Sequence, residues 1–269
     1  MTAGKDIAYH AGNYWFNMHS IGVEHEGFAA HGATWYSQTE VQTSADLVKY
    51  LAAKYDVPLD RQHIIGHDNA PGPQDDYVAG MHWDPGPYWD WTAFMDLLGA
   101  PEASGARGGA DGVPAVGSAV TISPRFATNK QTVEVCPDDD PTGDTDECVD
   151  RTEPANFLPV RTGPSDSAPL FADPAIHPDA DAGSDSIHDW GSTVQAGQQF
   201  VVAETSGDWT AIWFSGAKVW FHNPGGANTT DAPDVTVVRS GSDGATLYGS
   251  GYPQPDEYPP ACRRPRRSP

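Results

Sequence analysis

Histidine and carboxylate side chains gather in residues 63–91, a stretch that is also rich in proline, glycine and tryptophan. The short apolar run 64–65 predicts a strand that ends near His67, and the loop that follows should bring His82 and Asp84 back towards it. Imidazole and carboxylate groups are the ligands that Zn²⁺ takes when one coordination position is kept open for water. This stretch therefore predicts a catalytic metal site.

Four motifs follow one another in the first hundred residues. They are Tyr9-His10-Ala11-Gly12, Ile21-Gly22-Val23-Glu24-His25-Glu26-Gly27, Ile64-Ile65-Gly66-His67-Asp68, and Asp84-Pro85-Gly86-Pro87 with Trp91 four residues on. Together they resemble the zinc-dependent N-acetylmuramoyl-L-alanine amidases of the type 2, peptidoglycan-recognition-like family. The resemblance covers residues 5–99. It implies a peptidoglycan hydrolase that uses Zn²⁺ to cleave the amide bond between N-acetylmuramic acid and L-alanine.

The resemblance also assigns roles to single residues. His67 and Asp84 match the family's zinc ligands, and Glu24 matches its catalytic carboxylate. His82 stands two residues before Asp84, where many relatives have a lysine, so we expect it to stabilise the oxyanion that forms from the attacked carbonyl. On spacing alone, Glu24 is an ordinary exposed strand residue and Asp84 starts a turn.

A third protein ligand is expected outside this chain. The family's first zinc ligand is a histidine on an early strand, and no such strand precedes Tyr9 here. We therefore expect this histidine upstream of Met1, lost together with the signal peptide of a wall enzyme. Within the chain, His10 is the alternative third ligand. The remaining early histidines are interpreted as structural, and they are His19, His25, His31 and His63.

Residues 1–99 are predicted to form an α/β domain in which helices cover a mixed sheet. Strands are expected at 20–26 and 64–66, from apolar residues that alternate or cluster. Apolar residues at helical spacing predict helices at 38–54 and 90–98. Residues 100–114, rich in glycine, alanine and proline, predict a flexible linker.

Residues 115–238 predict an all-β domain with a core of its own. Short β-branched runs alternate there with glycine, proline and aspartate, at 119–122, 132–136, 157–161, 199–204, 208–214 and 218–221. Segments within 156–222 resemble bacterial SH3-like domains, namely Leu158-Pro159-Val160-Arg161-Thr162-Gly163-Pro164, Gly207-Asp208-Trp209 and Lys218-Val219-Trp220-Phe221. This resemblance implies attachment to peptidoglycan. An acidic insertion at 173–189 departs from it, and residues 239–269 are predicted to be a tail with an incomplete repeat.

Cys136 and Cys148 bracket an acidic loop, which predicts a disulfide rather than two free thiols. A disulfide implies an oxidising compartment, so we expect a secreted, cell-wall-associated monomer. The net charge of −22 argues against a nucleic-acid partner, and no apolar run is long enough to span a membrane. A non-catalytic wall-binding protein with an incomplete zinc site is the alternative function.

Overall fold

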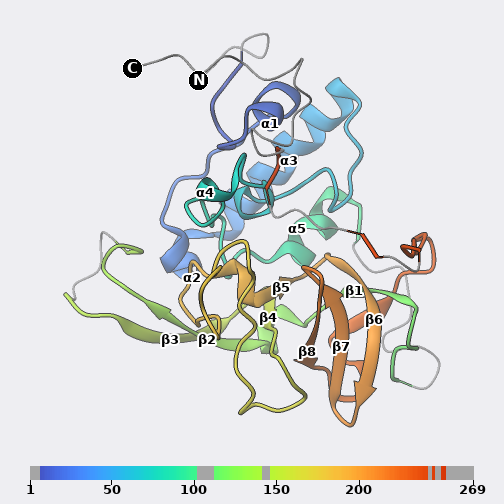
Figure 1. Ribbon diagram of the computed structural model, residues 1–269. Coiled ribbons are helices and arrows are strands. Elements are labelled where there is room, and N and C mark those ends of the chain that lie inside the picture. Colours follow the sequence, from blue (N-terminus) through green and yellow to red (C-terminus); the bar gives the residue numbers. More distant parts are fainter. Residues whose placement is uncertain (1–6, 102–111, 141–145, 242–243, 246–249, 253–269) are drawn as a thin grey trace, which may run out of the picture.

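The computed structural model describes residues 7–101, 112–140, 146–241, 244–245 and 250–252. Helices occupy the first hundred residues, and antiparallel sheets make up the rest (Figure 1). The helices of the first part are α1 (Tyr14–His19), η1 (Ala29–His31), α2 (Gly32–Trp35), α3 (Gln38–Tyr55), η2 (His67–Asn69), α4 (Asp75–Val78) and α5 (Trp91–Leu98). Among the described residues, no helix has the length and apolar character needed to cross a membrane.

Helices α3 and α5 confirm the two predicted helices, and local signals explain their ends. Ser37 accepts a hydrogen bond from the Glu40 amide at the start of α3, and Asp90 accepts one from the Ala93 amide at the start of α5. These side chains satisfy amides that the first turn of a helix leaves without a partner. Gly99 ends α5 with φ of 78°, in the left-handed region that glycine enters without steric cost.

The predicted mixed sheet is wrong for the described part of residues 1–99, which contains no strand. Residues 20–25 have no regular secondary structure, and Ile21 is half exposed. Residues 64–66 leave a turn in which the Ile64 amide donates to the Asp60 carbonyl. An apolar run becomes a strand only when a neighbouring strand pairs with its backbone, and neither segment has such a neighbour among the described residues.

Nine strands follow in the described residues of the β-rich part, 112–140 and 146–241. They are β1 (Ala119–Ile122), β2 (Lys130–Val135), β3 (Val149–Pro154), β4 (Phe157–Pro159), β5 (Thr193–Gln195), β6 (Gln199–Ser206), β7 (Trp209–Phe214), β8 (Ala217–His222) and β9 (Thr229–Asp231), with short helices η3 (Phe126–Thr128), η4 (Trp190–Ser192) and η5 (Pro224–Gly226). The largest sheet has the order β8-β7-β6-β1-β9, while β2 pairs with β3 and β4 with β5. All six predicted runs contain a strand. The described residues of the predicted tail, 239–241, 244–245 and 250–252, form no strand, and the rest of the tail lies outside the described residues.

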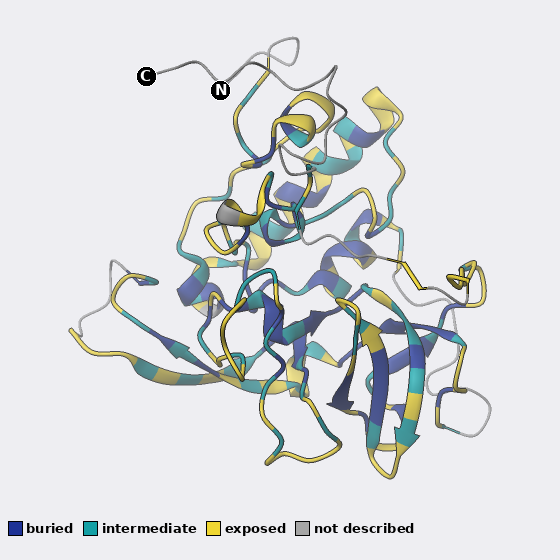
Figure 2. Ribbon diagram, viewed as in Figure 1, coloured by how far each residue is buried: buried dark blue, intermediate teal, exposed yellow. Residues whose placement is uncertain are grey.

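The two parts share hydrophobic cores. One cluster joins Ala30 and Tyr88 of the helical part to Val133, Val135, Ala155, Phe157 and Ile187 of the β-rich part. A second cluster places Ala196 against residues of α3 and α5 and against Trp89. Figure 2 shows buried residues on α5 and, across the junction, on β4 and β5. The β-rich part also has the predicted core of its own, around Ile122 and Phe221, in addition to these two clusters that cross the junction.

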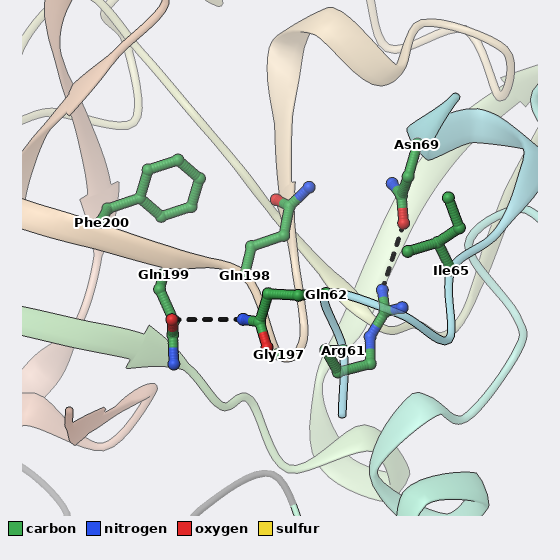
Figure 3. A pocket seen from close by; sticks show the side chains of 8 residues that line it. All are labelled: Arg61, Gln62, Ile65, Asn69, Gly197, Gln198, Gln199 and Phe200. Atoms are coloured by element: carbon green, nitrogen blue, oxygen red, sulfur yellow. Dashed lines mark hydrogen bonds between the residues drawn. The ribbon is translucent and has the colours of Figure 1, made fainter. Parts of the chain in front are cut away.

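Polar side chains also cross the junction. The Arg61 guanidinium donates to the Ala196 carbonyl at 3.4 Å, and Gln62 donates to the side chain of Gln199 at 3.2 Å (Figure 3). Asn69 donates to the Gln195 side chain at 3.3 Å. The turn that precedes the candidate metal residues is thus held by the loop between β5 and β6. The predicted linker that connects the two parts lies mostly outside the described residues.

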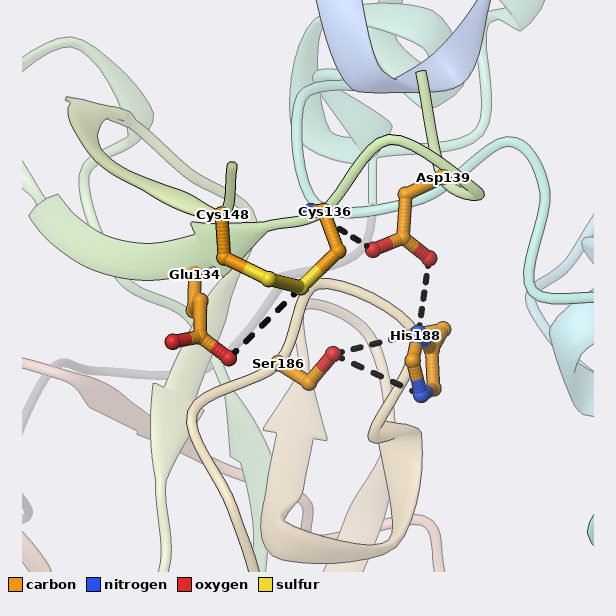
Figure 4. Close-up of a disulfide and its surroundings, with 6 residues drawn as sticks. All are labelled: Glu134, Cys136, Asp139, Cys148, Ser186 and His188. Carbon is orange, nitrogen blue, oxygen red and sulfur yellow. Dashed lines mark hydrogen bonds and ion pairs between the residues drawn. A yellow bond between two sulfur atoms is a disulfide. The ribbon is translucent and has the colours of Figure 1, made fainter. Parts of the chain in front are cut away.

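A disulfide joins Cys136 and Cys148, as predicted (Figure 4). The segment it closes carries two carboxylates that bind other parts of the chain. Asp139 accepts a hydrogen bond from His188 at 2.7 Å. Asp140 is buried and lies 2.6 Å from both His31 and Arg151, which connects the disulfide loop to the helical part.

The acidic insertion 173–189 is anchored by two of its own carboxylates, Asp173 and Asp189, which are buried. Asp189 accepts hydrogen bonds from His177 at 2.7 Å and from the Ser184 hydroxyl at 2.8 Å. Asp173 accepts one from Ser215 at 2.5 Å. Acidic residues of the insertion are therefore structural groups that fold it against the β-rich part.

Candidate metal site

His67 is placed by a tight turn rather than by a strand. It begins η2, directly after Gly66, and the Asn69 amide donates back to the Gly66 carbonyl at 3.1 Å. A Cβ atom at Gly66 would overlap the Asp68 carboxylate and the Pro85 ring, so only glycine fits between them. The imidazole of His67 is mostly buried.

The second half of the site is the loop 82–90. The Asp68 amide donates to the Asp84 carbonyl at 3.1 Å, which joins this loop to η2. Tyr36 donates to the Pro85 carbonyl at 2.6 Å. From the β-rich part, Asn156 donates to the carbonyls of Gly86 and Trp89 at 3.0 and 2.8 Å. Both parts of the chain therefore fix the loop that carries His82 and Asp84.

These contacts bring His67, His82 and Asp84 together. Nδ1 of His67 lies 3.6 Å from Oδ1 of Asp84, and Nδ1 of His82 lies 3.4 Å from the same oxygen. The two imidazole rings are 4.5 Å apart at their centres. One donor atom from each of the three residues lies within 4.8 Å of the other two. The structure thus unites the two predicted ligands with His82.

The carboxylate and the two imidazoles perturb one another electrostatically. The Asp84 carboxylate raises the pKa of His67, against the opposing effect of burial. Burial alone would raise the pKa of Asp84. The hydrogen bond and charge of His67, together with the charge of His82, outweigh this effect, so the pKa of Asp84 is lowered. Asp84 is therefore ionised at neutral pH and is able to bind a cation.

Asp68, next to His67, is a buried carboxyl that the sequence did not single out. Burial raises its pKa to about 7, although the hydrogen bond from Gln195 and the charge of Arg61 act in the opposite direction. Gln195 donates to Oδ2 at 2.5 Å, while Oδ1 has no partner among the described residues. The only signal for it was its place beside His67, because Gln195 is 127 residues away in sequence.

Glu24 is exposed and lies outside the group of three. Its charge nevertheless helps to raise the pKa of His67, so its carboxylate is within electrostatic reach of the site. It also acts on His25, whose pKa is lowered by burial. His25 itself bonds to Ser44 at 2.7 Å, which is a structural contact.

His10, the alternative ligand, does not join the group. Its Nε2 lies 2.8 Å from the Ser20 hydroxyl, and its Nδ1 lies 3.2 Å from the Ala8 carbonyl. The remaining early histidines also have local partners: His19 bonds to the Trp15 carbonyl, His31 to Asp140 and His63 to Asp60.

The donor set fits zinc. Ligand atoms about 2.1 Å from a tetrahedral Zn²⁺ lie about 3.4 Å apart, close to the 3.4 and 3.6 Å separations at Asp84. Two imidazoles and one carboxylate also match the chemistry of catalytic zinc sites, which leave a fourth position for water. Nε2 of His67 is buried without a hydrogen-bond partner among the described residues, so the ring is not already committed to a structural network.

Comparisons with known proteins show similarity to amidases. Over 107 residues the chain is 32% identical to N-acetylmuramoyl-L-alanine amidase A of Achromobacter lyticus, an alignment that covers 34% of this chain and 55% of that protein. The chain thus spans about half the length of this curated relative. No solved structure matches the chain. Residues 1–87, which contain all three residues of the candidate site, match the N-acetylmuramoyl-L-alanine amidase family, and the chain is a distant homologue of amidase A.

Proposed function

We propose that this protein is a peptidoglycan hydrolase that cleaves the amide bond between N-acetylmuramic acid and L-alanine with a zinc-activated water. The observation that carries the proposal is the cluster of His67, His82 and Asp84 inside the segment that matches the amidase family. The name of the Achromobacter relative states the same activity for that protein.

His67 and Asp84 would hold the metal, and we propose His82 as the third ligand. His82 is suited to this role because its Nδ1 faces the same Asp84 oxygen as Nδ1 of His67. Zinc bound there would supply a water of lowered pKa and would polarise the scissile carbonyl. The role expected from the sequence, a hydrogen bond from His82 to the oxyanion, stays a prediction. The variant His82→Lys distinguishes it from the role of a zinc ligand.

Glu24 is the group that we propose to move the proton. It takes a proton from the attacking water and passes it to the departing amine of L-alanine, which would otherwise leave as an unstable anion. Two observations support this role: Glu24 is exposed, so substrate can reach it, and its charge helps to raise the pKa of His67.

The β-rich part is proposed to serve as an SH3-like module that holds the enzyme on the cell wall, outside the cell. The disulfide is compatible with this setting, because such bonds persist in oxidising compartments. The full chain, with its metal removed, should still pellet with insoluble peptidoglycan. Failure to pellet would contradict the role of holding the enzyme on the wall.

The proposal is tested by measuring bound zinc and amide cleavage on the same preparation of residues 1–269. We expect about one Zn²⁺ per chain by elemental analysis and the release of free peptide stems from purified sacculi. A chelator should abolish release, and added Zn²⁺ should restore it. A folded protein that binds sacculi but holds no zinc and releases no stems would instead be the non-catalytic wall-binding protein.

A further inference from the structure

A cavity lies at the junction of the two parts of this protein. It has a volume of about 310 Å³ and is lined by the segment 61–69 on one side and the segment 197–200 on the other. Figure 3 shows the side chains of the two segments facing one another. This volume is at the lower end of the range of small-molecule sites, which is about 300–1,000 Å³.

The polar groups of the cavity are almost all uncharged amides. Gln62 and Gln199 are exposed, and the Gln62 side-chain amide donates to the Gln199 side-chain oxygen at 3.2 Å. This bond leaves the Gln62 oxygen and the Gln199 amide hydrogens for a ligand. Gln198 accepts a bond from the Gln195 amide through its oxygen, and its amide nitrogen is a further donor. Donors and acceptors therefore occur side by side.

Among the described residues that line this cavity, Arg61 is the one with a charged side chain, and its guanidinium is already engaged. It donates to the carbonyls of Ile64 and Ala196 and to the Asn69 side chain. It also stacks on the Trp91 ring at 3.7 Å. A carboxylate or phosphate ligand would find no uncommitted cation, and the net charge of −22 would repel it further.

Apolar surface completes the lining. Ile65 and Phe200 are partly buried and contribute an aliphatic and an aromatic side chain to the same cavity. Amide groups that donate and accept, next to apolar faces and without free charge, suit a neutral sugar ring. Hydroxyl and acetamido groups can bond to the amides, while the C–H faces of the ring pack on the apolar side chains.

We infer that this junction cavity binds an N-acetylated sugar of the glycan strand. Ile65 and Asn69 line the cavity and flank His67 in the chain, so a sugar held there lies beside the segment that carries the candidate metal residues. The inference rests on the proposed function for the choice of glycan. The charged peptide stem is disfavoured by the absence of a free cation in the lining.

Binding of an uncharged chitin tetrasaccharide, measured by isothermal titration calorimetry in the presence of a chelator, tests this inference. We expect saturable binding to the full chain. Each lost amide hydrogen bond should weaken binding about fivefold, so Gln62→Ala with Gln199→Ala should together weaken it about 25-fold. Gln199→Glu, which keeps the size of the side chain but removes the amide hydrogens that donate to a ligand, should also weaken binding.

Gln42→Ala is the matched control, because Gln42 is an exposed glutamine on α3 outside the cavity. It should leave binding unchanged. Absence of saturable binding, or equal affinity in the wild type and both cavity variants, would overturn the inference. The measurement needs neither zinc nor cleavage, so it tests sugar binding independently of amidase activity. A chain that binds the sugar through Gln62 and Gln199 but cleaves no amide bond would contradict only the amidase proposal.

Discussion

At the scale of single residues, the site combines groups from two short loops whose backbones bond directly to each other. The Asp68 amide meets the Asp84 carbonyl, and this contact sets His67 beside Asp84. His82 enters the same group from the loop 82–90, with its side chain largely exposed. The proposed proton transfer, the proposed metal binding and the local stability involve different neighbouring residues, so each can be tested separately.

Glu24→Gln should lower amide cleavage by roughly 10²-fold or more while leaving bound zinc at the wild-type level. The amide keeps the shape of the side chain but cannot accept a proton. Stem release and zinc content are measured together, with Glu26→Gln, an exposed acid two residues on, as the control. Loss of zinc along with activity would show that Glu24 is a ligand.

His82→Lys distinguishes a zinc ligand from an oxyanion donor. The lysine retains a hydrogen-bond donor and a positive charge but offers no imidazole nitrogen, so we expect zinc affinity to fall at least 10–100-fold, as in His82→Ala. Competition with a chelator measures the affinity, and His63→Ala is the control because His63 bonds to Asp60 instead. If His82→Lys keeps both zinc and activity, the residue is an oxyanion donor.

Asp68→Asn should remove one component of the pH dependence of stability. The folded pKa of about 7 lies above the usual value of 3.8, so between pH 4 and 7 the folded protein holds a proton that the unfolded chain has lost. The stabilisation is complete below about pH 4 and is lost as pH rises to about 7, at up to about 1.4 kcal/mol per pH unit.

Urea unfolding of metal-free protein at several pH values tests this. The free energy of unfolding of the wild type, minus that of Asp68→Asn, should decrease across that window and stay level above it. Asp96→Asn, at an exposed position on α5, should show no such trend. A difference that is constant with pH would mean that Asp68 is ionised throughout.

At the scale of elements, the β2–β3 hairpin reaches back to the helical part through the loop that the disulfide closes. Asp140 in that loop bonds to His31 at the end of η1 and to Arg151 on β3. Arg151 also donates to the Ala30 carbonyl at 2.7 Å. The disulfide therefore stabilises a contact between the two parts as well as a local loop.

Replacing Cys136 and Cys148 with serine should destabilise the protein by about 3 kcal/mol, because the unfolded chain regains the freedom that the closed loop removes. Thermal unfolding measures the loss. Reductant should lower the wild-type melting temperature to that of the variant and leave the variant unchanged. Equal melting temperatures of the oxidised wild type and the variant would show that the loop is held without the bond.

At the scale of the whole molecule, two hydrophobic clusters join the helical part to the β-rich part. Buried Ala30 and Tyr88 pack on strands of the β-rich part, and Asn156 holds the loop that carries Asp84. Exposing such a junction would uncover apolar side chains and leave buried hydrogen-bonding groups without partners. The two parts should therefore unfold together.

Calorimetry of residues 1–269 should show one cooperative transition, and residues 1–99 alone should show none. Asn156→Ala should lower both the melting temperature and zinc affinity, since it frees the loop 82–90. Asn129→Ala removes an asparagine that bonds within the β-rich part, and it should lower the melting temperature only. Two separated transitions, or a folded fragment 1–99, would contradict this coupling.

The sequence alone determined the features that depend on neighbouring residues. Helices α3 and α5 follow from apolar spacing and from their end residues Ser37, Asp90 and Gly99, all of which act within a few positions. The β-branched runs predicted β1 and β6 to β8, and two cysteines that bracket an acidic loop predicted the disulfide. Motif order pointed to His67 and Asp84 as a pair.

Only the tertiary structure decided which distant groups meet. No local pattern shows that Gln195 bonds to Asp68, that Asn156 holds the loop 82–90, or that His82 turns towards Asp84. The expected strands at 20–26 and 64–66 failed for the same reason, because a strand depends on a partner elsewhere in the chain. Apolar spacing shows which face of a segment can be buried, whereas the tertiary structure decides which other segment packs on that face.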